Sequence, residues 1–410
     1  MSSAVDIGRK VRHRLVLRRA AKALAKTNEP LGSGRFDVVV YFADNAENLY
    51  QLTQWIDVLR VIDQSHPVVI ITRSADAALA LREDRSNPFP VVYASRHLDI
   101  DPIIDGHDPK VTFYVNHHRG NFAMLWHPTL MHVYLGHGES DKIGISASNQ
   151  FKAYDFAFIA GQAAIDRIKR RLINYDADQR LIEVGRPQLD VAQPSAPTTL
   201  PPTNAPETVL YAPSWEGDRE ANSYGSLRSH GVAIMSALLA DDRYRVIFRP
   251  HPLSGYRERS YGQARDDVAA LVSAAAKERP ESGHFVDVGS EFGWQLGACD
   301  VCIADVSAVA LNAVAADTPV VVTKPASASA IVSDSSVMSR FDLLPANQAS
   351  EIAQWLSSAR SGEMSRRIVE IRDYCFGDTS PGAATERFVA ATERVINVRD
   401  ALIRERDATY

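Results

Sequence analysis

The length, composition and charge of the chain exclude several classes of protein. Its 410 residues are enough for two domains of ordinary size, and 45% hydrophobic with 23% charged residues is typical of a globular protein in water. The net charge of −5 gives no reason to expect a nucleic-acid partner. We see no signal peptide and no apolar run near the ~20 residues of a membrane span, and therefore expect a cytoplasmic protein.

The first segment, residues 1–28, differs from the rest because its charges are almost all basic. Eight Lys and Arg residues lie between Arg9 and Lys26, with no acidic residue after Asp6. Apolar residues recur among them, at Val11, Leu15, Leu17 and Leu24. A basic amphipathic helix suits an anionic membrane surface, whereas a solvated helix or arm is the equal alternative. The first reading predicts a peripheral protein on the inner face of the cell membrane.

From Phe36 onward, short apolar strands alternate with helical stretches. The predicted strands of this half are 36–42, 68–71, 91–93, 111–115, 131–135, 156–160 and 181–184. Helical spacing follows the first strand at 49–62, the second at 75–81 and the sixth at 162–172. This alternation predicts an α/β fold with a parallel sheet covered on both faces. We assign residues 35–190 to a first Rossmann-like domain that holds the acceptor.

A proline-rich segment separates this domain from a second one. Residues 191–206 contain five prolines and no glycine, which indicates a stiff linker. The alternation then restarts, with strands predicted at 209–211, 244–248, 284–286, 301–304 and 320–322. We assign residues 207–380 to a Rossmann-like nucleotide-donor domain, and expect a helix within 381–410 to pack back on the first domain. Ligands of doubly wound sheets bind at the carboxyl ends of the strands, which predicts a site in the cleft between the domains.

Polar and aromatic side chains follow four of the predicted strands. These clusters are Gly136-His137-Gly138 with Lys142, Ala212-Pro213-Ser214-Trp215, Arg249-Pro250-His251-Pro252 and Asp305-Val306-Ser307. Because they come from both domains and should face one cleft, we interpret them together as a ligand site. No acidic or His/Cys cluster indicates a metal site, and no cofactor is expected.

Each cluster has a chemical use and a simpler alternative. His137 between two glycines could accept a hydroxyl proton near neutral pH, or could merely bond within a turn. Arg249 and His251, stiffened by prolines, suit a pyrophosphate, or form a rigid turn. Ser307 at a helix start offers a hydroxyl and free N–H groups to an anion, and would also cap the helix. Asp305 could orient a hydroxyl or accept an N–H, and Trp215 could stack on a ligand or simply pack.

At these residues the chain resembles the CDP-glycerol glycerophosphotransferase family, the teichoic acid polymerases and primases. The resemblance extends from about Tyr134 to Thr385. The matching stretches are His137-Gly138 with Lys142 (His-Gly-x-x-x-Lys), 185–190 (Gly-x-Pro-Arg-x-Asp), 211–215 (Tyr-Ala-Pro-Thr-Trp), 249–252 (Arg-Pro-His-Pro) and Asp300 with 305–307 (Asp-x-x-x-x-Asp-Tyr-Ser-Ser). The chain departs from the motifs at Gln188 for an arginine, Ala308 for a serine and Asn312 for an acidic residue.

The resemblance implies a two-domain GT-B fold and a CDP-activated polyol as donor. A hydroxyl of a glycan or lipid-linked acceptor of the cell envelope would attack the phosphorus next to the polyol, and CMP would leave. His137 would be the base, and His251, Arg249 and Ser307 would hold the pyrophosphate, with His251 counted among the catalytic residues. The predicted donor site is completed by Asp305, Ser214, Trp215 and Lys142.

Two other functions are compatible with the same sequence. A GT-B glycosyltransferase using a nucleotide sugar, or a related sugar epimerase, would share the fold and the pyrophosphate site. A nucleotide-binding relative without turnover is the second alternative, suggested by Ala308 and Asn312. The products formed from CDP-glycerol and from UDP-sugars separate all three.

Overall fold

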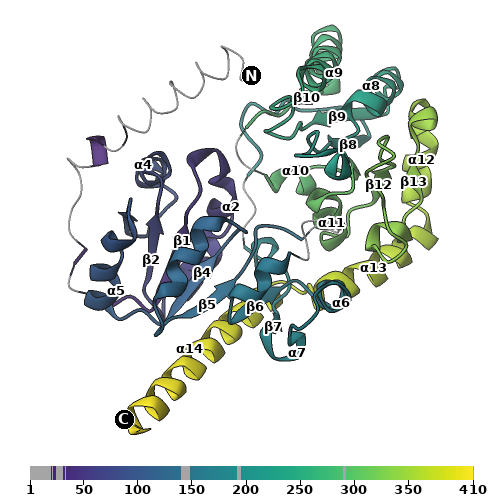
Figure 1. The fold of residues 1–410 in the computed structure, drawn as a ribbon. Helices are drawn as coiled ribbons and strands as arrows, with labels where there is room; N and C mark the ends of the chain where they lie inside the picture. The colour runs from purple at the N-terminus through teal and green to yellow at the C-terminus, as the bar shows by residue number, and fades with distance from the viewer. Residues whose placement is uncertain are drawn as a thin grey trace, which may run out of the picture.

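The computed structural model describes residues 20, 22–24, 31–32, 34–139, 148–191, 195–289 and 292–409. They form two α/β domains, each built on a sheet in which every strand pairing is parallel (Figure 1). The predicted fold class, two doubly wound Rossmann-like domains, is therefore confirmed. The basic helix proposed for residues 1–28 lies mostly outside the described residues.

The first domain contains a seven-stranded sheet of order β3-β2-β1-β4-β5-β6-β7. Its strands are β1 (Val38–Phe42), β2 (Val68–Thr72), β3 (Val91–Tyr93), β4 (Val111–Tyr114), β5 (Met131–Tyr134), β6 (Phe156–Ile159) and β7 (Leu181–Glu183). Its helices are α2 (Tyr50–Thr53), α3 (Ile56–Asp63), α4 (Ala75–Glu83), α5 (Asp101–His107), α6 (Gln162–Arg171) and α7 (Ala177–Arg180).

The second domain contains a six-stranded sheet of order β10-β9-β8-β11-β12-β13. Its strands are β8 (Glu207–Ala212), β9 (Tyr244–Phe248), β10 (Phe285–Val286), β11 (Val301–Ala304), β12 (Val320–Thr323) and β13 (Leu343–Leu344). Its helices are α8 (Val232–Leu239), α9 (Arg259–Glu278), α10 (Trp294–Gly297), α11 (Ala308–Ala315), α12 (Ile352–Ala359) and α13 (Gly362–Phe376).

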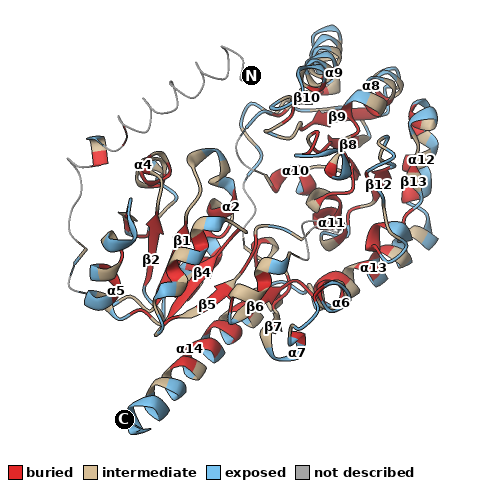
Figure 2. Ribbon diagram, in the orientation of Figure 1, coloured by how far each residue is buried: buried red, intermediate tan, exposed pale blue. Residues whose placement is uncertain are grey.

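Both sheets are buried on both faces, as Figure 2 shows by the colour of the strands. In β8, Val209 and Tyr211 belong to one hydrophobic cluster, while Leu210 and Ala212 belong to the cluster on the other side. Successive side chains of a strand point to opposite faces, so a strand covered by helices on both sides must be apolar throughout. This is why the strands appear in the sequence as continuous apolar runs.

The boundaries differ from the predicted ones where glycine or short length weakens the pattern. The sequence predicts a helix near 266–277, whereas α9 begins at Arg259. Its first turn contains Gly262, which disfavours a helix in isolation. A Cβ added at Gly262 would lie 3.2 Å from the Gly255 Cα, and one added at Gly255 would lie only 2.5 Å from the Gly262 Cα, so the two glycines let the backbones approach closely. The two-residue β13 and the single turn α10 were not predicted.

The last helix, α14 (Ala383–Thr409), leaves the second domain and packs on the first (Figure 1). The Phe388 ring lies 5.4 Å from the Trp55 ring and 5.8 Å from the Phe113 ring, between centroids. Further along, Lys110 Nζ is 2.9 Å from Asp400. The chain therefore crosses between the domains twice, and α14 restrains their separation.

The domains also touch directly, along α6 and α13. The Tyr374 hydroxyl donates to Asp166 (2.7 Å). A Cβ added at Gly161 would lie 2.5 Å from the Cys375 carbonyl oxygen, so the backbones meet without an intervening side chain. This contact fixes how the strand ends of one sheet face those of the other.

Part of the N-terminal segment belongs to the core of the first domain. Ala20 and Leu24 are 4% and 1% exposed and join the same hydrophobic cluster as Leu59 and Phe388. Leu24, which we expected to contact lipid, is therefore unavailable to a membrane. Within the described part of the chain, no helix combines the length and the apolar character needed to cross a bilayer.

Candidate functional site

The predicted loops of the two domains meet at the carboxyl ends of β5 and β11. A Cβ added at Gly138, after β5, would lie 3.4 Å from the Cβ of Ala308, the first residue of α11, and 3.9 Å from Arg186 Nη2. His137 and Ser307 immediately precede these two contact residues. The structure thus brings His137 and Ser307 to one junction between the domains.

His137 is held in the form that can accept a proton. Its Nδ1 lies 3.0 Å from the Val115 carbonyl oxygen, which can only accept, so Nδ1 carries the proton and Nε2 has the lone pair. Burial lowers the pKa of His137, and the Arg186 charge lowers it further, against opposing contributions from the Val115 hydrogen bond and Asp44. The imidazole is therefore neutral near pH 7, as a general base requires.

The turn before His137 is fixed by two features of Gly136. Its φ is +70°, a conformation that favours glycine. Its carbonyl oxygen accepts a 2.9 Å hydrogen bond from the Trp55 indole, between α2 and α3. The position of His137 is consequently set by the core of the first domain.

A cavity of about 100 Å³ lies beside His137 and is lined by His117, Tyr134, Arg167 and Arg186, among others. The His117 ring stacks on Tyr134 with centroids 4.1 Å apart. Burial lowers the pKa of His117 to about 3, and among the described residues its ring nitrogens have no hydrogen-bond partner. His117 is thus a neutral wall of the cavity. The described residues contain no group of three His, Cys, Asp or Glu side chains able to hold a metal.

Ser307 is the N-cap residue, directly before the first residue of α11, and lies at this junction. It is 7% exposed and extended (φ −158°, ψ 169°), and its hydroxyl makes no capping bond. Its Oγ has no hydrogen-bond partner among the described residues. A buried polar atom without a partner is costly, and the first N–H groups of a helix attract anions. Ser307 and the start of α11 therefore offer a hydroxyl and free N–H groups to an anion.

Asp305 is buried inside the second domain and holds the surrounding segments in place. Its side chain is fully buried, and its carboxylate accepts hydrogen bonds from Ser214 N (2.5 Å), Ser226 N (3.1 Å) and Thr323 Oγ1 (2.6 Å). Burial raises the pKa of Asp305, and these hydrogen bonds oppose the rise. Of the two uses predicted for Asp305, its carboxylate serves the second, accepting N–H groups, and it ties the segment after β8 to the end of β12.

Arg249, which the sequence predicts to hold the pyrophosphate, forms an ion pair inside the second domain. Its Nη1 lies 2.9 Å from Asp287 and donates to the Gly289 carbonyl (2.5 Å), with both charged side chains at least 93% buried. Asp287 accepts from Gln295 and Gly289 as well. The sequence predicts a cation, Arg249, at the end of β9. Its counter-ion is Asp287, which follows the adjacent strand β10.

His251 and Trp215 lie at neighbouring strand ends and stack, with ring centroids 6.2 Å apart. Leu253 N donates to His251 Nδ1 (3.1 Å), so in the neutral ring Nε2 carries the proton and can donate to an anion. The buried Glu216 carboxylate accepts from the backbone of Gly255 and Arg257 (2.9 and 2.8 Å), which fixes the loop after His251. Lys142 lies outside the described residues.

Arg186 is the residue that we had not selected. It follows β7 and Gly185 (φ +76°), and α14 packs on this turn, where Thr385 N donates to Asp190 (2.7 Å). Burial lowers the pKa of Arg186 to about 10. The motif at 185–190 contained it, but only the folded chain shows that it borders Gly138 and Ala308.

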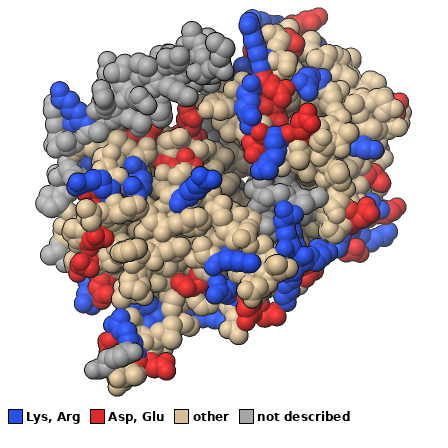
Figure 3. Space-filling model, viewed as in Figure 1, with Lys and Arg blue, Asp and Glu red and all other residues tan. Residues whose placement is uncertain are grey.

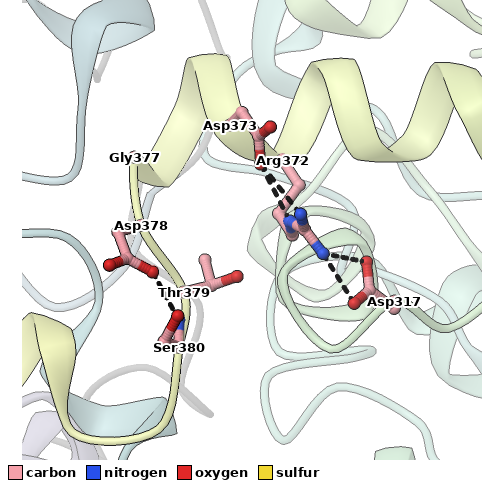
Figure 4. Close-up of a pocket in the computed structure, with 7 residues that line it drawn as sticks. All are labelled: Asp317, Arg372, Asp373, Gly377, Asp378, Thr379 and Ser380. Carbon is pink, nitrogen blue, oxygen red and sulfur yellow. Dashed lines mark hydrogen bonds and ion pairs between the residues drawn. The ribbon is translucent and has the colours of Figure 1, made fainter.

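A second, larger hollow lies away from this junction. It measures about 610 Å³ and is lined by Asp317, Arg372, Asp373, Asp378 and neighbours near the crossover to α14. Figure 4 shows Arg372 between Asp317 and Asp373, and Asp378 bonded to Ser380. Arg372 is thus paired with two acids, and the lining carries three carboxylates against one guanidinium, which does not suit a phosphate. Asp317 lies beyond the end of α11 that is opposite Ser307. Figure 3 shows basic and acidic side chains intermingled on the face drawn, with no dominant basic patch.

Comparison with known proteins gives one family and a set of similar folds. Residues 103–327, more than half of the chain, match the family described as CDP-glycerol:poly(glycerophosphate) glycerophosphotransferase. The solved wall teichoic acid polymerase TagF is 12% identical and has a TM-score of 0.58, with 97% of this chain and 99% of that chain covered. A Rickettsia africae glycosyltransferase (12%, TM-score 0.52, 88% and 99% covered) and S. aureus MnaA with UDP (9%, 0.51, 88% and 97%) share the fold. No curated protein matches.

Proposed function

The protein belongs to the CDP-glycerol:poly(glycerophosphate) glycerophosphotransferase family, and from this premise we propose that it transfers a polyol phosphate from a CDP-activated donor to a hydroxyl of a cell-envelope acceptor. One observation carries the proposal. At the junction of the two domains, a histidine with an accepting Nε2 meets a helix start whose serine hydroxyl has no hydrogen-bond partner among the residues that the structure describes. A base beside an anion site is the minimum that phosphoryl transfer to a hydroxyl needs.

In the proposed reaction, separate groups of the protein accept the proton, bind the phosphates and stabilise the leaving group. The acceptor hydroxyl gives its proton to His137 Nε2 as its oxygen forms a bond to the phosphorus that carries the polyol. The bond from that phosphorus to the oxygen bridging it to CMP breaks, and CMP leaves with the electron pair. Ser307 and the first N–H groups of α11 hold the phosphates, and the His251 Nε2–H neutralises charge on the leaving side.

Ligand binding tests the donor class before any acceptor is known. We expect CDP-glycerol to raise the melting temperature, because a ligand at 100 times its Kd adds about 2.7 kcal/mol to the free energy of unfolding. CMP should give a smaller shift, and UDP-sugars at equal concentration should give none. A shift with UDP-sugars but not with CDP compounds would favour a glycosyltransferase or epimerase instead.

We further propose that the acceptor is membrane-bound and that basic residues between Arg9 and Arg19 draw the enzyme to it. Each basic residue near an anionic surface contributes about 1 kcal/mol, and high salt should abolish the attraction. Because Ala20 and Leu24 belong to the core, the test must keep the chain whole.

We expect the full chain to sediment with anionic vesicles, and a full-length variant with Gln at Arg9, Lys10, Arg12, Arg14, Arg18 and Arg19 to stay in the supernatant. Neutral vesicles and 1 M salt are the controls. Equal sedimentation of the two proteins with anionic vesicles would show that this segment is not an anchor.

A further inference from the structure

We propose that Arg186, rather than Arg249, is the arginine that contacts the donor's phosphates, at the phosphorus under attack. The inference rests on the proposed function for the identity of the donor, but its evidence is the geometry around the guanidinium. Arg186 Nη2 and the Cβ of Ala308 border the same point above Gly138, at 3.9 and 3.4 Å. The cation of one domain therefore faces the anion-binding helix start of the other.

The Arg186 charge has no counter-ion among the described residues. Its Nη2 donates to the neutral amide oxygen of Gln54 (3.1 Å), and its buried Nε has no partner in the described part of the chain. Glu139, the nearest acid that affects it, is ion-paired to Arg167. A buried guanidinium without a carboxylate is unfavourable unless a ligand supplies the negative charge.

Arg249 offers the opposite case. It is neutralised by Asp287 and also bonded to Gly289. Moving it to a ligand would leave Asp287 buried with an uncompensated charge. Arg249 keeps N–H donors on Nε and Nη2, but its charge is already balanced by Asp287. Of the two arginines, only Arg186 makes no ion pair with a carboxylate of the described residues.

The position of Arg186 beside His137 indicates which phosphate it contacts. Arg186 Nη2 would lie 3.9 Å from a Cβ added at Gly138, the residue directly after His137, and the Arg186 charge lowers the pKa of His137. The base must lie beside the attacking hydroxyl, so a cation next to it meets the oxygens of the phosphorus under attack. Negative charge on these oxygens changes during the transfer, and a guanidinium placed beside them stabilises the charge of the transition state.

The test replaces Arg186 and reads both binding and turnover. We expect Arg186→Gln to lower kcat for CDP-glycerol at least about 100-fold, and to weaken binding of CDP-glycerol and of inorganic pyrophosphate about 10-fold. Cytidine binding should not change. Arg186→Lys should recover part of both losses. Arg180→Gln is the matched control, because Arg180 lies at the other end of β7 and bonds the Tyr154 carbonyl.

The pH profile separates contact with the reacting phosphate from a merely structural role. Without the Arg186 charge, His137 is protonated more easily, so the acid limb of kcat should move to higher pH in Arg186→Gln. Besides Arg186, the titratable groups around His137 in the described part of the chain are Tyr50, Asp44, His117, Tyr134, Glu139 and Arg167, and the variant keeps all of them.

The outcomes distinguish this inference from the proposed function. If wild type binds pyrophosphate and Arg186→Gln does not, Arg186 is the phosphate ligand even where CDP-glycerol is not turned over. If Arg186→Gln keeps wild-type kcat and pyrophosphate affinity while wild type converts CDP-glycerol, the function stands and the inference is wrong. If wild type binds neither pyrophosphate nor CDP-glycerol, both are wrong.

Discussion

His137→Ala is expected to lower kcat by about 100- to 10,000-fold, the usual contribution of a general base. Because His137 Nδ1–H donates to the Val115 carbonyl, the lone pair of Nε2 is available to accept a proton at the domain junction. Because the pKa of His137 is lowered by burial, the wild-type rate should fall only as the pH drops below the ordinary histidine range. That fall is the step in which Nε2 becomes protonated, and it should be missing from the residual activity of the variant.

The variant must also be shown to fold and to bind. Its melting temperature and its affinity for CMP should stay close to those of wild type, since His137 is on the acceptor side of the junction. His66→Gln is the matched control, because His66 pairs with Asp37 at the opposite end of the sheet (2.8 Å). Near-wild-type turnover by His137→Ala would refute the assignment of the base.

Arg249→Gln is expected to destabilise the second domain rather than to act mainly on the donor. Removing one member of a buried ion pair costs about 3–5 kcal/mol, and Asp287, 3% exposed, would be left without its cation. For a domain of this size the loss lowers the melting temperature by roughly 6–20 °C. Differential scanning calorimetry measures it directly.

The double variant Arg249→Gln/Asp287→Asn separates pairing from ligand binding. It removes both charges and keeps polar groups for Gly289 and Gln295, so it should recover much of the lost stability. His251→Ala, by contrast, should weaken donor binding more than CMP binding, with little effect on unfolding. If Arg249→Gln unfolds at the wild-type temperature and loses affinity for the donor but not for CMP, Arg249 binds the donor and the stability prediction is wrong.

Much of the fold could be predicted because each long strand is an apolar run bounded by polar turns. Alternate residues of β8 pack into the hydrophobic clusters on the two sides of its sheet, so a strand buried on both faces is visible in the sequence as an apolar run. The two residues of β13 are too few to show any repeating pattern of apolar side chains. The start of α9 is hidden by Gly262, whose role depends on Gly255 packed against it.

The site was predictable to the extent that it follows strand ends. That rule located His137 and Ser307, which the fold brings together through Gly138 and Ala308. It could not show that Asp287 neutralises Arg249, since the pair joins strand ends 38 residues apart. Nor could it show that no carboxylate of the described residues pairs with Arg186, or that Leu24 is in the core, because both depend on packing between distant segments.

The nucleotide released from CDP-glycerol shows which bond the enzyme breaks. The enzyme is incubated with CDP-glycerol and a lipid-linked hydroxyl acceptor in anionic vesicles, and the nucleotides are separated by chromatography. Attack at the phosphorus next to glycerol, with His137 taking the proton, predicts CMP as the nucleotide product and its loss in His137→Ala. Release of CDP instead would mean that the carbon–oxygen bond breaks, as in glycosyl transfer, and would contradict the account.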